Sequence, residues 1–62
     1  MSPTEYARYM LKDHLRRHKT SIRKLAPEME MTHATMARFL RGNPVESVSL
    51  DKIYSFFHVD LP

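Results

Sequence analysis

One short segment of the chain, MTHATMARFLRG at residues 31–42, gathers side chains that can donate and accept hydrogen bonds. His33, Thr35 and Arg38 supply an imidazole, a hydroxyl and a guanidinium group, and between them Ala34 adds a small methyl group. A guanidinium can bond guanine O6 and N7 together, and an imidazole or hydroxyl can bond base edges or phosphate. A methyl group can contact the methyl of thymine. These residue types therefore suit contact with the edges of bases in duplex DNA.

The same segment has the spacing of a helix. Met36 and Phe39 recur at helical intervals and define an inward side. Thr32 is a good N-cap, and Gly42, the only glycine in the chain, suits a left-handed C-cap. A core helix needs no polar first turn, whereas a helix inserted by its end into the major groove does. We therefore predict a helix over residues 33–41 with its first turn directed at DNA.

Positive charge is concentrated in one part of the chain. The formal net charge is +3, from 10 basic and 7 acidic residues. The segment HLRRHKTSIRK, residues 14–24, contains no acid, and its Lys and Arg residues are Arg16, Arg17, Lys19, Arg23 and Lys24. One-sided positive charge suits a polyanion such as nucleic acid, although a solvated surface with a chance cluster has the same composition.

The length of the chain and the residues that it lacks argue against several classes of protein. Sixty-two residues make one domain with scant room for an active-site pocket. The absence of cysteine excludes disulfides, cysteine-ligated zinc and a thiol nucleophile. No phosphate-binding loop, nucleophile motif or paired-carboxylate motif is present, so we expect no enzyme, no cofactor and no small-molecule ligand. No apolar run is long enough to span a bilayer and no signal peptide is present, so we expect no membrane partner and a cytoplasmic location.

Two helices are predicted before this segment. The first covers residues 3–18, because Ser2 and Glu5 form a capping box around Pro3 at its start. The second covers residues 22–29, and its stripe of buried positions consists of Ile22, Leu25, Ala26 and Met29. Ser21 is its expected N-cap, and Pro27 should kink or shorten it at a cost of up to about 3 kcal/mol.

A last helix is predicted over residues 50–58. Ser49 is its expected N-cap, and the apolar residues Val59 and Leu61 follow it. Four of the methionines fall on positions that we expect to be buried, namely Met10, Met29, Met31 and Met36. Because the predicted elements are four helices, the whole chain is expected to be all-α.

Residues 21–42, SIRKLAPEMEMTHATMARFLRG, resemble the helix-turn-helix of the Cro and lambda-repressor type. In that family a capping Ser or Thr opens the second helix, and an apolar residue and a small Ala follow four and five positions later. The matching residues here are Ser21, Leu25, Ala26, Met31 after the turn, Met36 in the third helix and Gly42 at its end. The resemblance implies a small lambda-repressor-like domain of four to five helices. It also implies a transcriptional regulator, most simply a repressor, that binds double-stranded DNA as a homodimer on a near-palindromic operator.

The resemblance also implies roles for individual residues. The base-reading positions are His33, Ala34, Thr35 and Arg38, and the phosphate-binding positions are Ser21, Ile22, Thr32, Arg41 and Asn43. From their charge alone we add four phosphate partners, Arg17, Lys19, Arg23 and Lys24. The chain departs from the family pattern at Ile22, where Gln is common, at Pro27, and at Glu30, which replaces the turn glycine. A left-handed Glu30 would cost about 1–2 kcal/mol.

Other interpretations of the sequence concern partners and metals. Phe56 lies to one side of the expected inward stripe of the last helix, which makes it a candidate for a dimer interface or a cover for the first helix. His14 and His18 have a spacing that can hold zinc, but no third ligand is evident, so we expect ordinary histidines and no metal. The same fold could instead serve as a protein-interaction module, such as an antitoxin or an adaptor.

Overall fold

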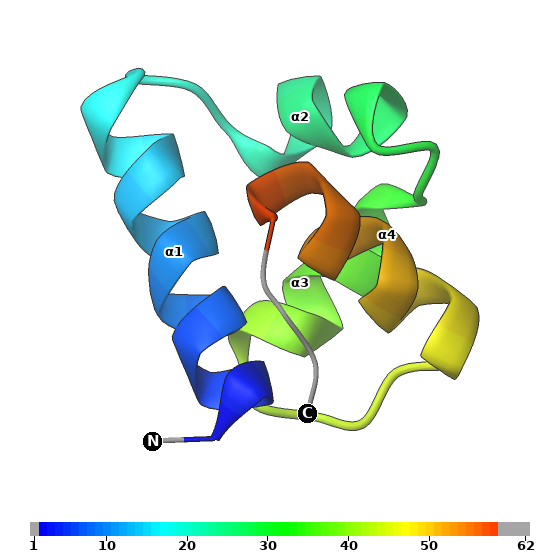
Figure 1. The fold of residues 1–62 in the computed structure, drawn as a ribbon. Helices are drawn as coiled ribbons and strands as arrows, with labels where there is room; N and C mark the ends of the chain where they lie inside the picture. The colour runs from blue at the N-terminus through cyan, green and yellow to red at the C-terminus, as the bar shows by residue number, and fades with distance from the viewer. Residues whose placement is uncertain (1, 59–62) are drawn as a thin grey trace.

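Four helices make up the part of the chain that the computed structural model describes, residues 2–58. Figure 1 shows them in chain order as α1 (Pro3–Arg17), α2 (Ile22–Glu28), α3 (His33–Leu40) and α4 (Ser47–Phe57). No β-strand occurs in residues 2–58, which confirms the all-α class. Val59 and Leu61 lie outside the described residues.

The first three helices lie within one residue of their predicted bounds. At the start of α1, the Ser2 Oγ accepts a hydrogen bond from the Glu5 N–H at 3.2 Å, as the capping box predicts. Pro27 is in the last turn of α2, which ends at Glu28, one residue earlier than predicted. The helix is thus short but keeps its apolar stripe.

The start of α4 was predicted wrongly. The helix begins at Ser47 rather than residue 50, and its N-cap is Glu46, whose carbonyl accepts the Leu50 N–H at 3.1 Å. Val45 and Leu50 occupy the two positions of a hydrophobic staple, and both pack against the core. This pair sets the direction of the chain before Ser49, which therefore lies inside the first turn of the helix.

The core contains residues from all four helices. Its buried members are Ala7, Leu11, Leu25, Ala26, Met29, Met36, Phe39, Ile53 and Tyr54. Met29 and Met36 are buried as predicted, but Met31 is half-buried against the core. Met10 is also only half-buried, because it lies beside the stripe of α1 that Ala7 and Leu11 define. Each helix thus contributes an apolar face.

Helices α1, α2 and α3 end in the same backbone arrangement. The residue after each C-cap is left-handed: Lys19 has φ 48°, Glu30 has φ 55° and Gly42 has φ 88°. After α2, the Glu30 N–H donates to the Pro27 carbonyl at 3.1 Å and the Met31 N–H to the Ala26 carbonyl at 2.9 Å. This pair of bonds is a Schellman motif, and it joins α2 to α3 through only four residues.

Replacement of Glu30 by glycine should stabilise the protein. Glycine adopts a left-handed conformation without the steric cost that glutamate bears, but it gains entropy in the unfolded chain. The net gain in the free energy of unfolding should reach up to about 1 kcal/mol, measured by urea denaturation. Gly42→Ala is the matched control: nothing lies within 4 Å of an added Cβ, so backbone strain alone should destabilise it by about 1 kcal/mol. A Glu30→Gly protein less stable than wild type would contradict this account of the turn.

Candidate nucleic-acid interface

The two sides of α3 differ sharply in burial. Met36 and Phe39 are 0% and 1% exposed, while His33, Ala34 and Arg38 are exposed. Because α3 packs against both α2 and α1, its inward side is fixed in the core. The polar first turn and Arg38 are consequently presented to solvent on a rigid support, as the sequence predicts.

The first turn of α3 is held by a pair of threonines. The Thr32 Oγ1 accepts a hydrogen bond from the Thr35 N–H at 3.1 Å and donates its own hydrogen to the Thr35 Oγ1 at 2.8 Å. Thr32 is therefore the N-cap that the sequence predicts. A phosphate contact by the Thr32 hydroxyl would have to compete with its bond to Thr35. The hydrogen of the Thr35 hydroxyl, in contrast, stays free to donate to a base or phosphate.

The predicted contact residues at the end of α3 surround its C-cap. An Arg38 Nη2 lies 3.4 Å from the Pro44 carbonyl, and the Arg41 Nε lies 3.4 Å from the Ala37 carbonyl. Both bonds are long and exposed, so they cost little to exchange for a stronger acceptor. The Asn43 N–H donates to the Arg38 carbonyl at 3.0 Å, which leaves the exposed Asn43 side chain outside the cap.

The start of α2 offers backbone groups rather than a capping side chain. Ser21 has the extended conformation of an N-cap, but its hydroxyl makes no capping bond to the helix. Ile22 is half-buried against the core and so serves packing. Arg23 and Lys24 follow with exposed side chains. Phosphate contacts at this point would come from backbone amides and these two cations.

Most of the basic segment is available for contact with a polyanion. In residues 2–58 the ion pairs are confined to Asp13, which lies 2.6 Å from Arg16 and 3.4 Å from Arg17. Lys19 is exposed and, as the left-handed residue after α1, has a fixed backbone position. Asp13 thus offsets part of the charge at the end of α1, while Lys19, Arg23 and Lys24 keep theirs.

Arg8 supports the candidate site, and the sequence did not lead us to predict this role. Its Nε donates to the Phe39 carbonyl at 2.7 Å, and its guanidinium carbon lies 4.9 Å from the centre of the Phe39 ring. The contact ties the end of α3 to α1. The sequence position of Arg8 could have indicated this contact, because Arg8 lies three residues before buried Leu11, at the border of the apolar stripe of α1.

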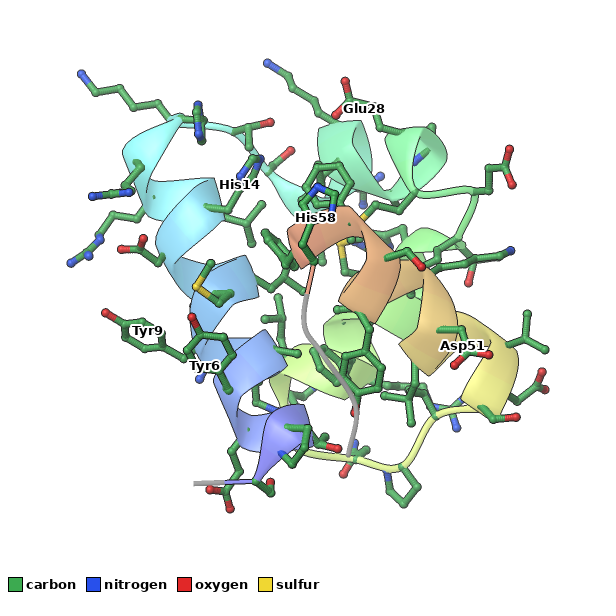
Figure 2. The ribbon with its side chains drawn as sticks, viewed as in Figure 1. Tyr6, Tyr9, His14, Glu28, Asp51 and His58 are labelled. Carbon is green, nitrogen blue, oxygen red and sulfur yellow. The ribbon has the colours of Figure 1, made fainter. Side chains whose placement is uncertain are left out.

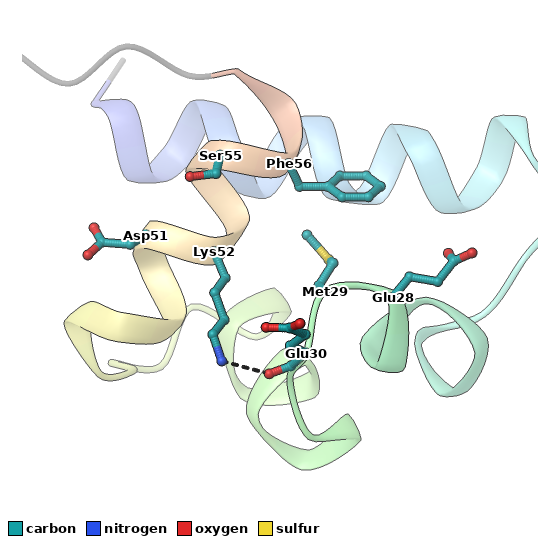
Figure 3. Close-up of a pocket in the computed structure, with 7 residues that line it drawn as sticks. All are labelled: Glu28, Met29, Glu30, Asp51, Lys52, Ser55 and Phe56. Atoms are coloured by element: carbon teal, nitrogen blue, oxygen red, sulfur yellow. Dashed lines mark hydrogen bonds between the residues drawn. The ribbon is translucent and has the colours of Figure 1, made fainter.

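Two further bonds between helices support the same arrangement. The Thr4 and Tyr54 hydroxyls lie 2.8 Å apart and connect α1 to α4. The Lys52 Nζ donates to the Glu30 carbonyl at 2.8 Å and so connects α4 to the turn before α3 (Figure 3). Neither bond follows from helical spacing, since each depends on how the helices pack.

An acidic and apolar hollow lies between the end of α2 and α4 (Figure 3). It has a volume of about 380 Å³ and is lined by Glu28, Met29, Glu30, Asp51, Lys52, Ser55 and Phe56. Phe56 is 37% exposed, as its place beside the apolar stripe suggested. Its acids make this hollow unsuited to phosphate, so it differs in kind from the basic segment.

Comparison of the chain with protein-family models, curated proteins and solved structures gives no match. Among the described residues, no three metal-ligating side chains converge on one point. None of the four described helices is long and apolar enough to cross a membrane. Function is therefore inferred from the geometry and charge of the chain itself.

Loss of the Arg8 contact should loosen α3. Arg8→Ala removes a charged hydrogen bond and a cation–π contact, which together predict a loss of about 1.5–3 kcal/mol in the free energy of unfolding. Lys12→Ala, an exposed change on the same helix, should stay within about 0.5 kcal/mol of wild type. Urea denaturation of both variants measures the difference, and equal stabilities would show that Arg8 does not hold α3.

Proposed function

We propose that this chain is a sequence-specific DNA-binding transcriptional regulator, most simply a repressor, in which α2 and α3 act as a helix-turn-helix of the Cro and lambda-repressor type. The division of α3 into a buried side and an exposed polar end carries the proposal. A four-residue turn joins the two helices, and the basic segment that leads into α2 supplies charge for a polyanion. Helix α3 would enter the major groove by its N-terminal end.

In this proposal the exposed residues of α3 read bases. Arg38 has the reach and the paired donors to bond guanine O6 and N7, and its weak bond to Pro44 is easily given up. Ala34 and the methyl group of Thr35 would contact thymine methyls, and His33 would donate to a base edge or phosphate. The cations Arg17, Lys19, Arg23, Lys24 and Arg41 would bond phosphates, together with Asn43, Thr32 and the Ser21 and Ile22 amides.

The same proposal includes a homodimer on DNA. Phe56 is exposed at the hollow that contains Met29, and the lining of the hollow includes acidic side chains as well as Lys52. Such a surface can be complementary to a second copy of itself, as a two-fold interface requires. Two copies would place their α3 helices about 34 Å apart, one turn of duplex DNA.

Selection from a random duplex library, followed by titration of the winner at two salt concentrations, tests the proposal. A DNA-binding regulator should recover an inverted repeat and bind it far more tightly than scrambled duplex. Its affinity should fall steeply with salt, because each phosphate contact releases counterions. Weak binding without a recovered motif would contradict the proposal.

Substitutions at Arg38 and Lys24 should have different effects on DNA affinity. Arg38→Ala should cost about 1–3 kcal/mol on the selected site and relax the preference at one base pair, because it removes a base contact. Lys24→Ala should weaken binding about equally on all sequences and reduce the salt slope by about 1. Fluorescence anisotropy on the selected duplex and its single-base variants separates the two. Identical losses on every sequence would rule out Arg38 as a base reader.

Loss of Phe56 should uncouple the two copies. Phe56→Gln should weaken binding to a full inverted repeat by roughly tenfold or more, since burial of a Phe side chain contributes about 1.5–3 kcal/mol. Affinity for a single half-site should stay unchanged. Val48→Gln is the matched control, because Val48 is 58% exposed on the same helix outside the hollow. If Val48→Gln and Phe56→Gln behaved alike, the Phe56 interface would be wrong.

A protein-interaction module, such as an antitoxin or an adaptor, is the alternative. The hollow with Phe56 and three acids supports it, because an apolar floor with charged edges suits a protein partner. Steep dependence of DNA affinity on salt favours the regulator, whereas a protein contact shows little counterion release.

A further inference from the structure

Two histidines meet at the end of α1, within the basic segment of residues 14–24. The ring centres of His14 and His18 are 4.3 Å apart, with an angle of 38° between the planes. Figure 2 shows His14 on the side of α1 that faces the end of α4, and His18 is the C-cap of α1. We propose that His14 and His18 form a binding site for one divalent transition-metal ion of the copper, nickel and zinc group, with water in its remaining positions.

The distance between the rings fits one shared ion. Metal–nitrogen bonds to imidazole are about 2.0–2.1 Å long, so two imidazoles on one ion have ring centres roughly 5 Å apart. The observed pair needs only small side-chain rotations to reach that distance, because both residues already lie on one face of a helix. The His18 ring is exposed, so a change of its rotamer would complete the chelate.

Aromatic packing prepares His14 for this role. The rings of Phe56 and Phe57 meet it edge-on, with centres 5.5 and 5.7 Å away. These contacts restrict the rotation of the His14 ring.

Charges of both signs surround the pair. Arg16, Arg17 and Lys19 flank His18, and the negative end of the α1 dipole beside the pair offsets part of their charge. Asp13 is the residue before His14 in α1, and Glu28 is the last residue of α2. Asp13 is paired with Arg16 and Arg17, so Glu28 is the freer of the two.

The number of protein ligands narrows the choice of ion. Within residues 2–58 no third ligating side chain converges on the pair, so the protein supplies two ligands and the other positions of the ion stay open. Imidazole affinity rises from cobalt through nickel to copper, and zinc falls below copper. Cu²⁺ should therefore bind most tightly, ahead of Ni²⁺ and Zn²⁺, while Mg²⁺ and Ca²⁺ should not bind.

Titration of the full chain with Cu²⁺, Ni²⁺, Zn²⁺ or Mg²⁺ alone, in a buffer that does not chelate metals, tests the proposal. Isothermal titration calorimetry should give one ion per chain in the predicted order. The Cu²⁺ complex should show electron paramagnetic resonance couplings to two imidazole nitrogens. Bound metal should also raise the melting temperature, because a metal that bridges one helical turn binds the folded chain better than the unfolded chain.

His18→Gln is the decisive variant, since its side chain is exposed and its ring contact is with His14, the other proposed ligand. It should weaken Cu²⁺ binding about tenfold or more, because a chelate becomes a single bond. His14→Gln should do the same, with circular dichroism to confirm the fold. His33→Gln, at the exposed N-terminal end of α3, is the matched control and should leave the affinity for Cu²⁺ unchanged. Unaltered affinity in His18→Gln, or an equal loss in His33→Gln, would overturn the proposal.

Discussion

The position of Phe39 is the constraint on which the arrangement of α3 depends. Its side chain is 1% exposed, and its carbonyl accepts hydrogen bonds from the Arg8 Nε at 2.7 Å and from the Gly42 N–H at 3.0 Å. Arg8 also covers its ring. One residue thus joins the core, α1 and the C-cap of α3. Because α3 is fixed from its buried side, the exposed residues His33, Ala34 and Arg38 are held in place by that packing.

Elements defined by local chemistry were well predicted from the sequence. Ser2 and Thr32 act as side-chain N-caps, Gly42 is left-handed, and the bounds of α1, α2 and α3 agree within one residue. The start of α4 was predicted wrongly, because Ser49 is a stronger N-cap by residue type than Glu46, the N-cap in the structure. The staple of Val45 and Leu50 acts through burial in the core, which a local pattern does not reveal.

The candidate site was predictable to a similar extent. Periodicity alone indicates which residues of α3 face outward, and the exposure of His33, Ala34 and Arg38 agrees with it. The hydroxyl bond between Thr32 and Thr35 and the contact of Arg8 with Phe39 were not predicted. Both depend on rotamers and distances between helices, which spacing along the chain does not contain. Glu30 shows the reverse case, since the turn requires a left-handed residue even where the sequence supplies no glycine.

Insertion of α3 into the major groove can be tested by nuclear magnetic resonance, with backbone amide shifts followed as the selected duplex is added to labelled protein. The largest shifts are expected at residues 33–38 and 21–24, with small shifts at Tyr6 and Tyr9, which lie exposed on α1 (Figure 2). Shifts centred on the hollow of Glu28, Asp51 and Phe56, with α3 unchanged, would contradict insertion of α3 into the major groove.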